Sequence, residues 1–374
     1  MNTTTDQLNI PKIKIIGFGG CGSNTLVYLS GLVYPGFELI AANTDFLNLA
    51  RCGIQPSIPL GENICRGLGT GGDVTLGRLA AENSYQDLIA RIKGTSLLIL
   101  TAGMGGGTGS GAIEIAARIA RSLDVPTISF VSLPFSFESD MRKTTAYEST
   151  IALQQFTDTL ITLPNDKLLS QGNSGIPLTT ALHLANIPLQ KFIAGLFDLI
   201  DHTGAMHVDL SYVNDALLAQ QGMFITTGSS NSPDRISSAL DNALNIPFID
   251  AAQFETTSHV VMKLTGNITV EETHTAIAQT QERFPSQPRV TPIIASNDAS
   301  QQLSISLLVS GIGATAVSYP SSWVETRVEK RTALPHTSSH SIKEPDQQPH
   351  DFHDILEVPA YIRNENNRRK VLND

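Results

Sequence analysis

A glycine-rich segment in the first third of the chain limits what this sequence can fold into. Residues 103 to 111 read Gly-Met-Gly-Gly-Gly-Thr-Gly-Ser-Gly, between an apolar run at residues 97 to 100 and an amphipathic stretch at residues 112 to 123. Glycine lets backbone N–H groups approach an anion closely, and a helix N-terminus adds unsatisfied donors and a positive dipole end. The order strand, glycine loop, helix therefore predicts a phosphate-binding loop. The competing interpretation is a flexible glycine linker.

This segment differs from a Walker loop, which needs Gly-Lys followed by Ser or Thr. No lysine occurs in residues 103 to 111, whereas Thr108 and Ser110 supply hydroxyl groups. The charge of a bound phosphate would therefore be met by backbone dipoles and by a magnesium ion.

Composition narrows the class of protein. The chain has 374 residues, which at about 150 residues per domain indicates two domains and a tail. A net charge of −10 argues against nucleic acid as a partner, because no basic face is available to neutralise phosphates. The three cysteines lack metal or disulfide spacing, which fits a reducing cytoplasm. The polar N-terminus and the lack of any apolar run of about 18 residues predict neither a signal peptide nor direct membrane insertion.

Short apolar runs alternate with helical patterns from residue 12 to about residue 163, as is typical of a parallel sheet covered by helices. The expected strands are residues 12–16, 38–42, 97–101, 127–132 and 159–163, and the expected helices are residues 24–32, 85–93, 112–123 and 142–156. A second α/β domain with a mixed sheet is expected from strands at residues 223–227, 258–265, 290–296 and 303–312 and helices at residues 233–244 and 270–284. Loops at the carboxyl ends of parallel strands collect ligand groups.

Two more glycine-rich segments follow the first expected strands. Residues 17 to 22 read Gly-Phe-Gly-Gly-Cys-Gly, and residues 67 to 73 read Gly-Leu-Gly-Thr-Gly-Gly-Asp. The first matches the dinucleotide fingerprint G-x-G-x-x-G, so a Rossmann-type NAD-dependent oxidoreductase is one alternative. Several glycine loops that converge would surround a polyphosphate better than one pyrophosphate turn does. No histidine or lysine near an expected substrate pocket looks like a hydride-transfer acid.

Together these motifs resemble the FtsZ family, the bacterial tubulin-like GTPases of cell division. The resemblance spans nearly the whole chain and rests on segments that occur in family order, at residues 15–24, 43–45, 67–69, 103–111, 134–142 and 164–169. It implies a GTP- or GDP-binding protein that uses Mg²⁺, polymerises head to tail in the division ring and hydrolyses GTP between protomers. It also implies a cytoplasmic protein located at the division site.

The resemblance implies a tubulin-like α/β fold, in which a central helix joins a parallel-sheet nucleotide domain to a smaller domain with a mixed sheet. The expected divisions are a flexible N-terminus (1–10), a GTP-binding domain (11–180), the central helix (181–203), a second α/β domain (204–320), a disordered linker (321–350) and a partner-binding peptide (351–374).

The same resemblance assigns nucleotide-binding residues. The residues implied at the phosphates and their loops are Gly20, Cys21, Gly22, Asn24, Asp45, Gly71, Gly72, Gly105, Gly106, Gly107, Thr108 and Gly109. Glu138, Arg142, Asn165 and Ile187 are implied around the sugar and the base. From the residues alone, Glu138 and Arg142 would be a surface ion pair four positions apart on a helix.

The chain departs from the family at three positions that matter for chemistry. Ile187 occupies the place of an aspartate that contacts guanine, and Pro188 predicts that the central helix begins beside it. The resemblance implies that Asp209 acts on the nucleotide of the neighbouring protomer, but Tyr212 replaces a second aspartate and His207 an asparagine. A tyrosine is neutral near pH 7 and a poor base, so hydrolysis is expected to be slow. The alternative is a nucleotide-binding structural paralogue that co-assembles with division filaments and hydrolyses little GTP.

The end of the chain carries a short apolar motif after a segment rich in Pro, Ser, His and Gln. This motif resembles the family's C-terminal peptide, which binds membrane-tethering and regulatory division proteins, and a short apolar motif on a disordered tether is a common form of peptide ligand. Its expected partner-binding residues are Asp354, Ile355, Leu356, Val358, Pro359, Tyr361, Ile362 and Arg363.

Overall fold

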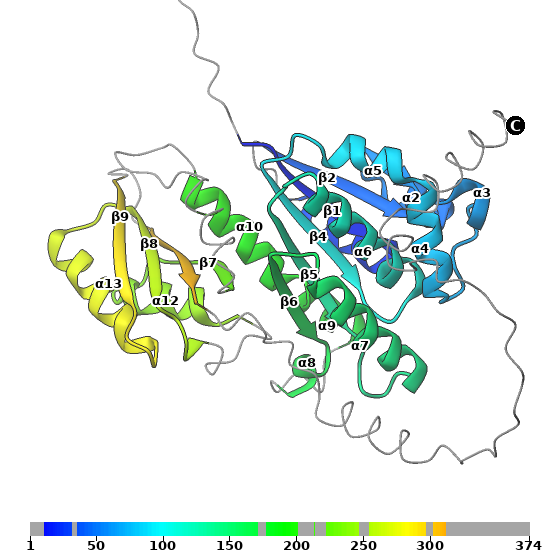
Figure 1. Ribbon diagram of the computed structural model, residues 1–374. Helices are drawn as coiled ribbons and strands as arrows, with labels where there is room; N and C mark the ends of the chain where they lie inside the picture. The colour runs from blue at the N-terminus through cyan, green and yellow to red at the C-terminus, as the bar shows by residue number, and fades with distance from the viewer. Residues whose placement is uncertain are drawn as a thin grey trace, which may run out of the picture.

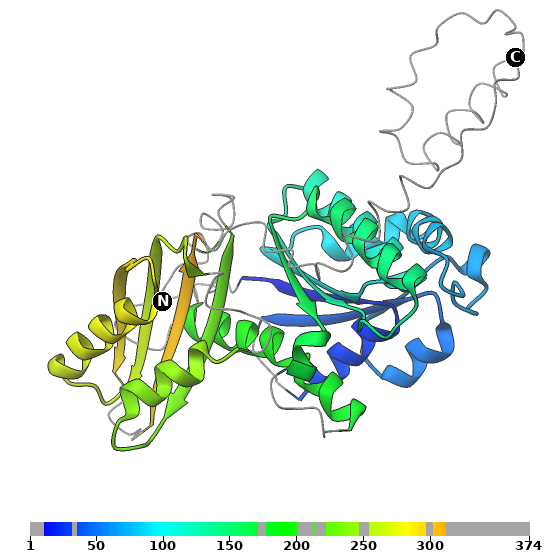
Figure 2. The same cartoon turned by 90° about the horizontal axis from the view of Figure 1, so that it is seen from below.

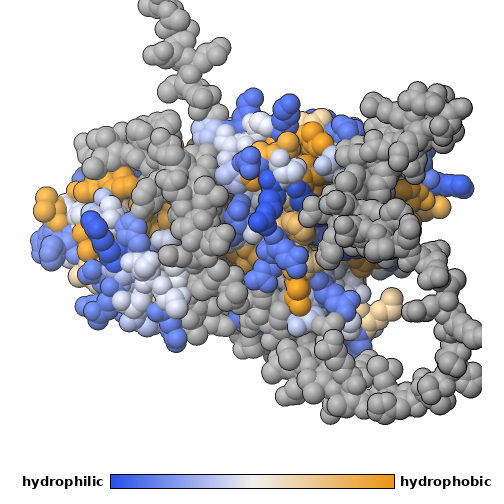
Figure 3. Space-filling model, in the orientation of Figure 1, coloured by the Kyte–Doolittle hydropathy of each residue, from blue (hydrophilic) through white to orange (hydrophobic). Residues whose placement is uncertain are grey.

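The computed structural model describes residues 11–31, 36–170, 177–200, 213, 222–246, 254–296 and 302–311. These residues form two sheets, with the long helix α10 lying between them (Figures 1 and 2). On the face drawn in Figure 3, exposed hydrophobic residues form separate patches among hydrophilic ones. In the described part of the chain, every helix is too short or too polar to cross a membrane.

The first sheet has six parallel strands in the order β3-β2-β1-β4-β5-β6. The strands are β1 (Ile13–Phe18), β2 (Phe37–Asn43), β3 (Ser57–Pro59), β4 (Leu97–Gly103), β5 (Thr127–Leu133) and β6 (Thr159–Pro164). All five expected strands are confirmed. Strand β3 was not expected because three residues are too few to show a periodic pattern.

Helices cover both faces of this sheet, and the central strands are buried on each side. Helices α4, α5, α6 and α7 pack on one face, and α1, α2 and α10 pack on the other. The bounds are α1 (Gly19–Leu29), α2 (Phe46–Cys52), α3 (Glu62–Cys65), α4 (Val74–Asn83), α5 (Tyr85–Ile92), α6 (Gly107–Ser122), α7 (Asp140–Gln154), α8 (Asp166–Ser170) and α9 (Leu178–Leu184).

Two expected helix starts were wrong by about a turn. Helix α1 begins at Gly19 rather than at Asn24, and α6 begins at Gly107 rather than at Ala112. Glycine has a low helix propensity, so a sequence pattern places glycines outside a helix. Here tertiary packing overrides that propensity, because a side chain at Gly22 or Gly109 would collide with neighbouring backbone.

Helix α10 (Ile187–Ile200) has Pro188 in its first turn, as expected. The ring of Phe192 lies 5.1 Å from that of Phe130 in β5 and 5.9 Å from that of Phe224 in β7. One buried helix therefore packs against both sheets. The expected end of this helix lies outside the described residues.

The second sheet has four strands in the order β7-β10-β8-β9, of which only β8 and β9 run parallel to each other. Its elements are β7 (Met223–Ser230), α12 (Arg235–Leu244), β8 (His259–Gly266), α13 (Val270–Arg283), β9 (Arg289–Ser296) and β10 (Leu303–Ser310). Met262 of β8 faces α13, where it meets the hydroxyl of Thr280, whereas the buried Lys263 donates to the backbone carbonyl of Asp198 in α10. The mixed sheet is confirmed.

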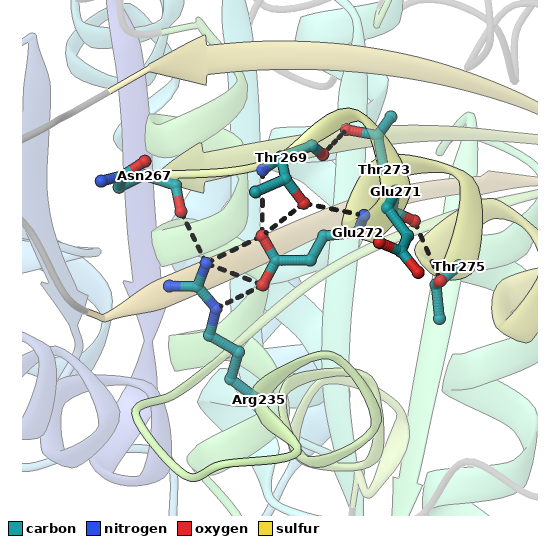
Figure 4. A network of polar contacts seen from close by, with 7 residues as sticks. All are labelled: Arg235, Asn267, Thr269, Glu271, Glu272, Thr273 and Thr275. Carbon is teal, nitrogen blue, oxygen red and sulfur yellow. Dashed lines mark hydrogen bonds and ion pairs between the residues drawn. The ribbon is translucent and has the colours of Figure 1, made fainter.

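A polar network ties α12 to the start of α13 (Figure 4). Arg235 donates from Nε to Glu272 Oε1 (2.8 Å) and from Nη2 to Glu272 Oε2 (2.9 Å). Glu272 also accepts the backbone N–H of Thr269, and the Thr269 hydroxyl accepts the N–H of Glu272, which forms a capping box. The Thr269 N–H, with a further contribution from Arg235, holds the pKa of Glu272 below its usual 4.5.

We expect Glu272→Gln to lower the free energy of unfolding by roughly 1–3 kcal/mol at neutral pH, because hydrogen bonds to a charged group are lost. Since the native pKa of Glu272 lies below 4.5, its ionic stabilisation is present above about pH 4.5 and is lost as the pH falls through the native pKa. The difference between variant and wild type should therefore narrow in acid, as measured by urea unfolding. Glu271→Gln, at the exposed neighbouring position, is the control and should show little change.

Candidate nucleotide-binding site

The loop that joins β4 to α6 needs glycine for its backbone conformation and for its packing. Gly105 has φ +91°, a left-handed value, and its N–H donates to the hydroxyl of Ser110 (2.9 Å). A Cβ at Gly105 would lie 2.7 Å from the carbonyl oxygen of Arg142. Gly106 is the N-cap of α6 and is extended. The N–H groups of the first turn of α6 therefore lie at the carboxyl edge of the sheet, without intrahelical acceptors.

The first turn of α1 lies directly against the first turn of α6. A Cβ at Gly19 would lie 3.1 Å from the backbone nitrogen of Gly109, and a Cβ at Gly22 would lie 2.7 Å from the carbonyl oxygen of Thr101 in β4. Two helix N-termini thus converge at neighbouring central strands. This arrangement concentrates backbone N–H donors and positive dipole ends in one place.

Helix α4, which follows the loop at residues 67 to 73, packs against α6 through glycines. A Cβ at Gly107 would meet the hydroxyl of Thr70 and would lie 2.5 Å from the carbonyl oxygen of Asp73, and a Cβ at Gly77 would collide with the carbonyl of Gly107. This close approach brings the second glycine loop to the start of α6. The sequence did not predict α4, although Asp73 is a recognisable N-cap whose side chain accepts the N–H of Leu76.

Three buried threonine hydroxyls join the loops. Thr44 Oγ1 lies 2.6 Å from Thr108 Oγ1, and Thr70 Oγ1 lies 3.5 Å from the same atom. Thr44 follows β2, Thr70 precedes α4 and Thr108 is in the first turn of α6, so the three hydroxyls come from three separate segments of the chain. Sequence reasoning had not assigned a role to Thr44 or Thr70, because no local pattern reveals which hydroxyls will meet.

Four of the predicted phosphate-binding glycines face open space. A Cβ at Gly20, Gly71, Gly72 or Gly106 would meet no atom within 4 Å, in contrast to the packed glycines beside them. Gly71 and Gly72 also have positive φ angles of 59° and 90°. The open positions belong to the three glycine-rich segments that the sequence singled out.

Two residues that were predicted to bind nucleotide, Asp45 and Cys21, make contacts with other protein groups in the structure. Asp45 is the N-cap of α2, and its carboxylate accepts the N–H of Asn48 (2.9 Å). Cys21 is exposed as a residue, but its sulfur packs beside Gly103 and lies 3.4 Å from the hydroxyl of Ser132. This local burial raises the pKa of the Cys21 thiol, so the thiol is neutral at physiological pH.

Glu138 and Arg142 form an ion pair, with 3.0 Å between Glu138 Oε2 and Arg142 Nε. Glu138 precedes the N-cap Ser139 of α7, so the pair is not one within a helix. The other carboxylate oxygen accepts the N–H of Phe135 (2.8 Å), which fixes the turn after β5. Asn165 follows β6 at the same edge; it is 7% exposed, and its Oδ1 has no hydrogen-bond partner within the described structure.

Helix α1 is joined by hydrogen bonds to the junction of α9 and α10. The hydroxyl of Thr25 donates to Asn186 Oδ1 (2.9 Å), and the hydroxyl of Tyr28 donates to Gln190 Oε1 (2.6 Å). Ile187 is half-buried as the first residue of α10. Three predicted site residues, Asp209, His207 and Tyr212, and the predicted partner-binding motif at residues 354 to 363 lie outside the described residues.

A separate cavity of about 480 Å³ lies toward the amino ends of β1 and β2, on the α10 side of the sheet. Its lining is mainly apolar and includes Ile15, Leu39 and Ile193. It is remote from the glycine loops, which lie at the carboxyl ends of the strands. In the part of the chain that the structure describes, no cluster of three or more His, Cys, Asp or Glu side chains could hold a metal ion.

The first sheet is parallel, helix N-termini converge at its carboxyl edge, and a buried central helix joins it to a mixed sheet. This combination defines the tubulin-like class of nucleotide-binding proteins. The GTPase domain of the Tubulin/FtsZ family matches residues 12–173. The chain is 31% identical to the cell division protein FtsZ of Coxiella burnetii over 94% of its own length and 96% of that protein. The chain belongs to the FtsZ family of tubulin-like cell-division GTPases.

Other comparisons agree. The chain is 33% identical to FtsZ of Buchnera aphidicola subsp. Acyrthosiphon pisum, over 80% of this chain and 79% of that one. A solved FtsZ dimer of M. jannaschii superposes with a TM-score of 0.68 at 30% identity, covering 81% of this chain and 88% of that chain. CetZ2 of Haloferax volcanii, at 20% identity, shares the fold with a TM-score of 0.67. Family membership places residues 17 to 22 in a tubulin-like domain rather than a dinucleotide-binding one.

Proposed function

We propose that this protein binds GTP at the carboxyl edge of its first sheet, assembles head to tail and hydrolyses GTP between protomers. The observation that carries this proposal is the set of four glycines that border open space within loops held together by threonine hydroxyls. Backbone donors in a rigid, open cradle suit a polyphosphate. Asn165 lies at the same edge, and among the described residues its buried carboxamide oxygen has no hydrogen-bond partner.

The residues present also fit a magnesium ion that is held mainly by the nucleotide. Mg²⁺ commonly keeps several waters and binds substrate phosphates rather than a cage of protein ligands. The ion would neutralise phosphate charge, which matches a loop that contains no lysine.

Exposed apolar side chains near the loops support assembly. Leu68 is 86% exposed in the loop before α4, and Leu47, Phe137 and Met141 are also exposed on segments that follow β2 and β5. In the second domain, Val270 is 88% exposed at the start of α13. Exposed apolar groups on two different surfaces suit a heterologous, open-ended contact, which generates a filament.

We further propose that residues 354 to 363 bind membrane-tethering and regulatory partners at the division site.

The experiment that tests the shared site is the dependence of turnover on protein concentration. If each active site needs two protomers, GTP hydrolysis per subunit should rise with concentration and level off once filaments form. The nucleotide that copurifies with the protein, GTP or GDP, is the first check on the ligand. A turnover per subunit that does not change with concentration would contradict hydrolysis between protomers.

We expect Leu68→Glu to raise the concentration needed for assembly by about tenfold or more, because an interface would then bury an unpaired carboxylate. Sedimentation of filaments measures this effect. GTP affinity of the monomer is measured alongside, because Leu68 lies in the glycine-rich loop at residues 67 to 73. Ile151→Glu, on the outer face of α7, is the matched control; equal assembly defects in both variants would show that Leu68 has no special place in the contact.

A further inference from the structure

Two loops on the β2 side of the candidate site are fastened to each other through their backbones. The N–H of Gly69 donates to the carbonyl of Thr44 (3.2 Å). Asp45 and Leu68 form an antiparallel β-bridge between the same two segments. The segment that follows β2 and the glycine-rich loop at residues 67 to 73 therefore form one structural unit.

The hydroxyl of Thr44 holds this two-loop unit against the first turn of α6. Thr44 is fully buried, and its Oγ1 lies 2.6 Å from Oγ1 of Thr108. The hydroxyl of Thr70, in the glycine-rich loop itself, lies 3.5 Å from the same atom, which is a weaker contact. In the described part of the chain, the only hydrogen bond of the Thr44 side chain is the one to Thr108. This bond therefore controls the spacing between the two-loop unit and α6.

The same spacing joins two parts of the glycine cradle. A Cβ at Gly107, in the first turn of α6, would lie 2.5 Å from the carbonyl oxygen of Asp73, at the end of the glycine-rich loop. Gly106 and Gly72 are the chain neighbours of these two residues, and both border open space. The two parts of the cradle therefore meet beside the contact that the threonine hydroxyls fasten.

The order of the strands places the glycine-rich loop at one end of a bound nucleotide. Helices α1 and α6 follow the central strands β1 and β4, and the two-loop unit lies beyond them on the β2 side. On the other side, the segments after β5 and β6 carry the Glu138 carboxylate and the Asn165 carboxamide. A carboxylate repels phosphate, so the phosphate chain would extend from the β5 side toward β2. Its last phosphate would lie nearest to the glycine-rich loop.

We propose that Thr44 is a positioning residue whose hydroxyl sets the distance between the glycine-rich loop and α6, and so supports the binding of a nucleoside triphosphate more than that of a diphosphate. This inference rests on the proposed function, because it concerns the same nucleotide site. Thr44 acts through Thr108 and does not touch the phosphates, since its side chain is fully buried.

Thr44→Val replaces the hydroxyl by a methyl group of similar size. Carbon and oxygen atoms approach each other to about 3.3–3.6 Å, so the contact of 2.6 Å with Thr108 would widen by roughly 0.7 Å or more. A binding site needs its groups within about 0.5 Å of their productive positions. The glycine-rich loop would therefore be displaced from the last phosphate, whereas α1 would keep its place at the others.

The test compares the dissociation constants of GDP and of GMPPNP, a GTP analogue that is not hydrolysed, for the full-length protein. Isothermal titration calorimetry with Mg²⁺, below the concentration for assembly, measures both. Thr44→Val should weaken GMPPNP relative to GDP by about fivefold or more compared with the wild type, as expected for one lost hydrogen bond. Thr44→Ala should change the ratio in the same direction, whereas Thr44→Ser, which keeps the hydroxyl, should retain the wild-type ratio.

Two controls show whether the effect is specific. Thr280→Val removes a buried hydroxyl that donates to the carbonyl of Ala276 in the second domain, and it should leave the ratio unchanged. In a Thr108→Val background, Thr44→Val should lower the ratio little further, because the two residues act as one unit. If Thr44→Ala and Thr44→Val weaken both ligands equally, or if Thr44→Ser behaves like Thr44→Ala, the inference is wrong although nucleotide binding stands. If neither ligand binds to the wild type, the proposed function itself fails.

Discussion

Gly106→Asp is expected to weaken nucleotide binding severely while leaving the fold at least as stable as that of the wild type. Gly106 is the N-cap of α6, and a side chain there would meet no protein atom within 4 Å. Aspartate is a better N-cap than glycine by a few tenths of a kcal/mol. The new carboxylate would lie beside the helix N-terminus, where the proposed site holds phosphate. Unit charges 4 Å apart repel by about 4 kcal/mol at an effective dielectric constant of about 20, so the affinity should fall by roughly 100-fold or more.

Titration with GTP measures the loss of affinity, and thermal unfolding without nucleotide measures the fold. Gly106→Asn is the matched control, because asparagine has nearly the same size and caps a helix equally well but carries no charge. It should lose much less affinity than Gly106→Asp. Unchanged GTP binding in Gly106→Asp would place the phosphates elsewhere and would overturn the proposed cradle.

Asp209→Ala is expected to lower GTP turnover by about 100-fold or more, the usual contribution of a positioned general base. Under the proposed mechanism Asp209 acts on the nucleotide of the neighbouring protomer, so its loss should leave GTP affinity and monomer stability unchanged. Steady-state phosphate release with assembled protein measures the effect. Equal turnover in variant and wild type would favour a structural paralogue that binds nucleotide and hydrolyses little.

A mixture of the two inactive variants tests the shared site directly. Asp209→Ala protomers bind GTP but lack the carboxylate, whereas Gly106→Asp protomers supply the carboxylate but bind GTP only weakly. If the two variants co-assemble, as co-sedimentation would show, some contacts will join the nucleotide site of an Asp209→Ala protomer to the Asp209 carboxylate of a Gly106→Asp protomer. Both parts of the site are intact in those contacts, so turnover should return in part. Continued inactivity of co-assembled filaments would mean that each protomer hydrolyses its own nucleotide.

Local patterns predicted most of the framework because each depends on few residues. The run at residues 97 to 100 in β4 is apolar without interruption, which is the pattern of a parallel strand buried on both faces. Pro188 marked the start of α10 because proline is well accommodated in the first turn of a helix. The segment between β2 and β4 was poorly predicted, since α2, α3 and β3 are each seven residues or shorter and show little periodicity.

The candidate site, like the fold, has some features that the sequence predicts and others that it does not. Glycine-rich segments after strands identified three of the loops, because a requirement for glycine is visible in the residues themselves. The hydroxyl contacts of Thr108 with Thr44 and Thr70 join positions 64 and 38 residues apart, so no local pattern could reveal them. The position of Asn165 beside the start of α10 also depends on an apolar cluster formed by separate segments.

By itself, the sequence determined that this chain is an α/β protein with glycine loops suited to phosphate, since strand burial and glycine conformation are short-range properties. Only the tertiary structure decided which glycines are packed and which border open space: Gly107 lies against α4 whereas Gly106, its neighbour, faces none of the protein. Adjacent identical residues cannot be told apart by their own chemistry. Their difference arises from how closely α4 and α6 approach, and that distance is set by the packing of the whole domain.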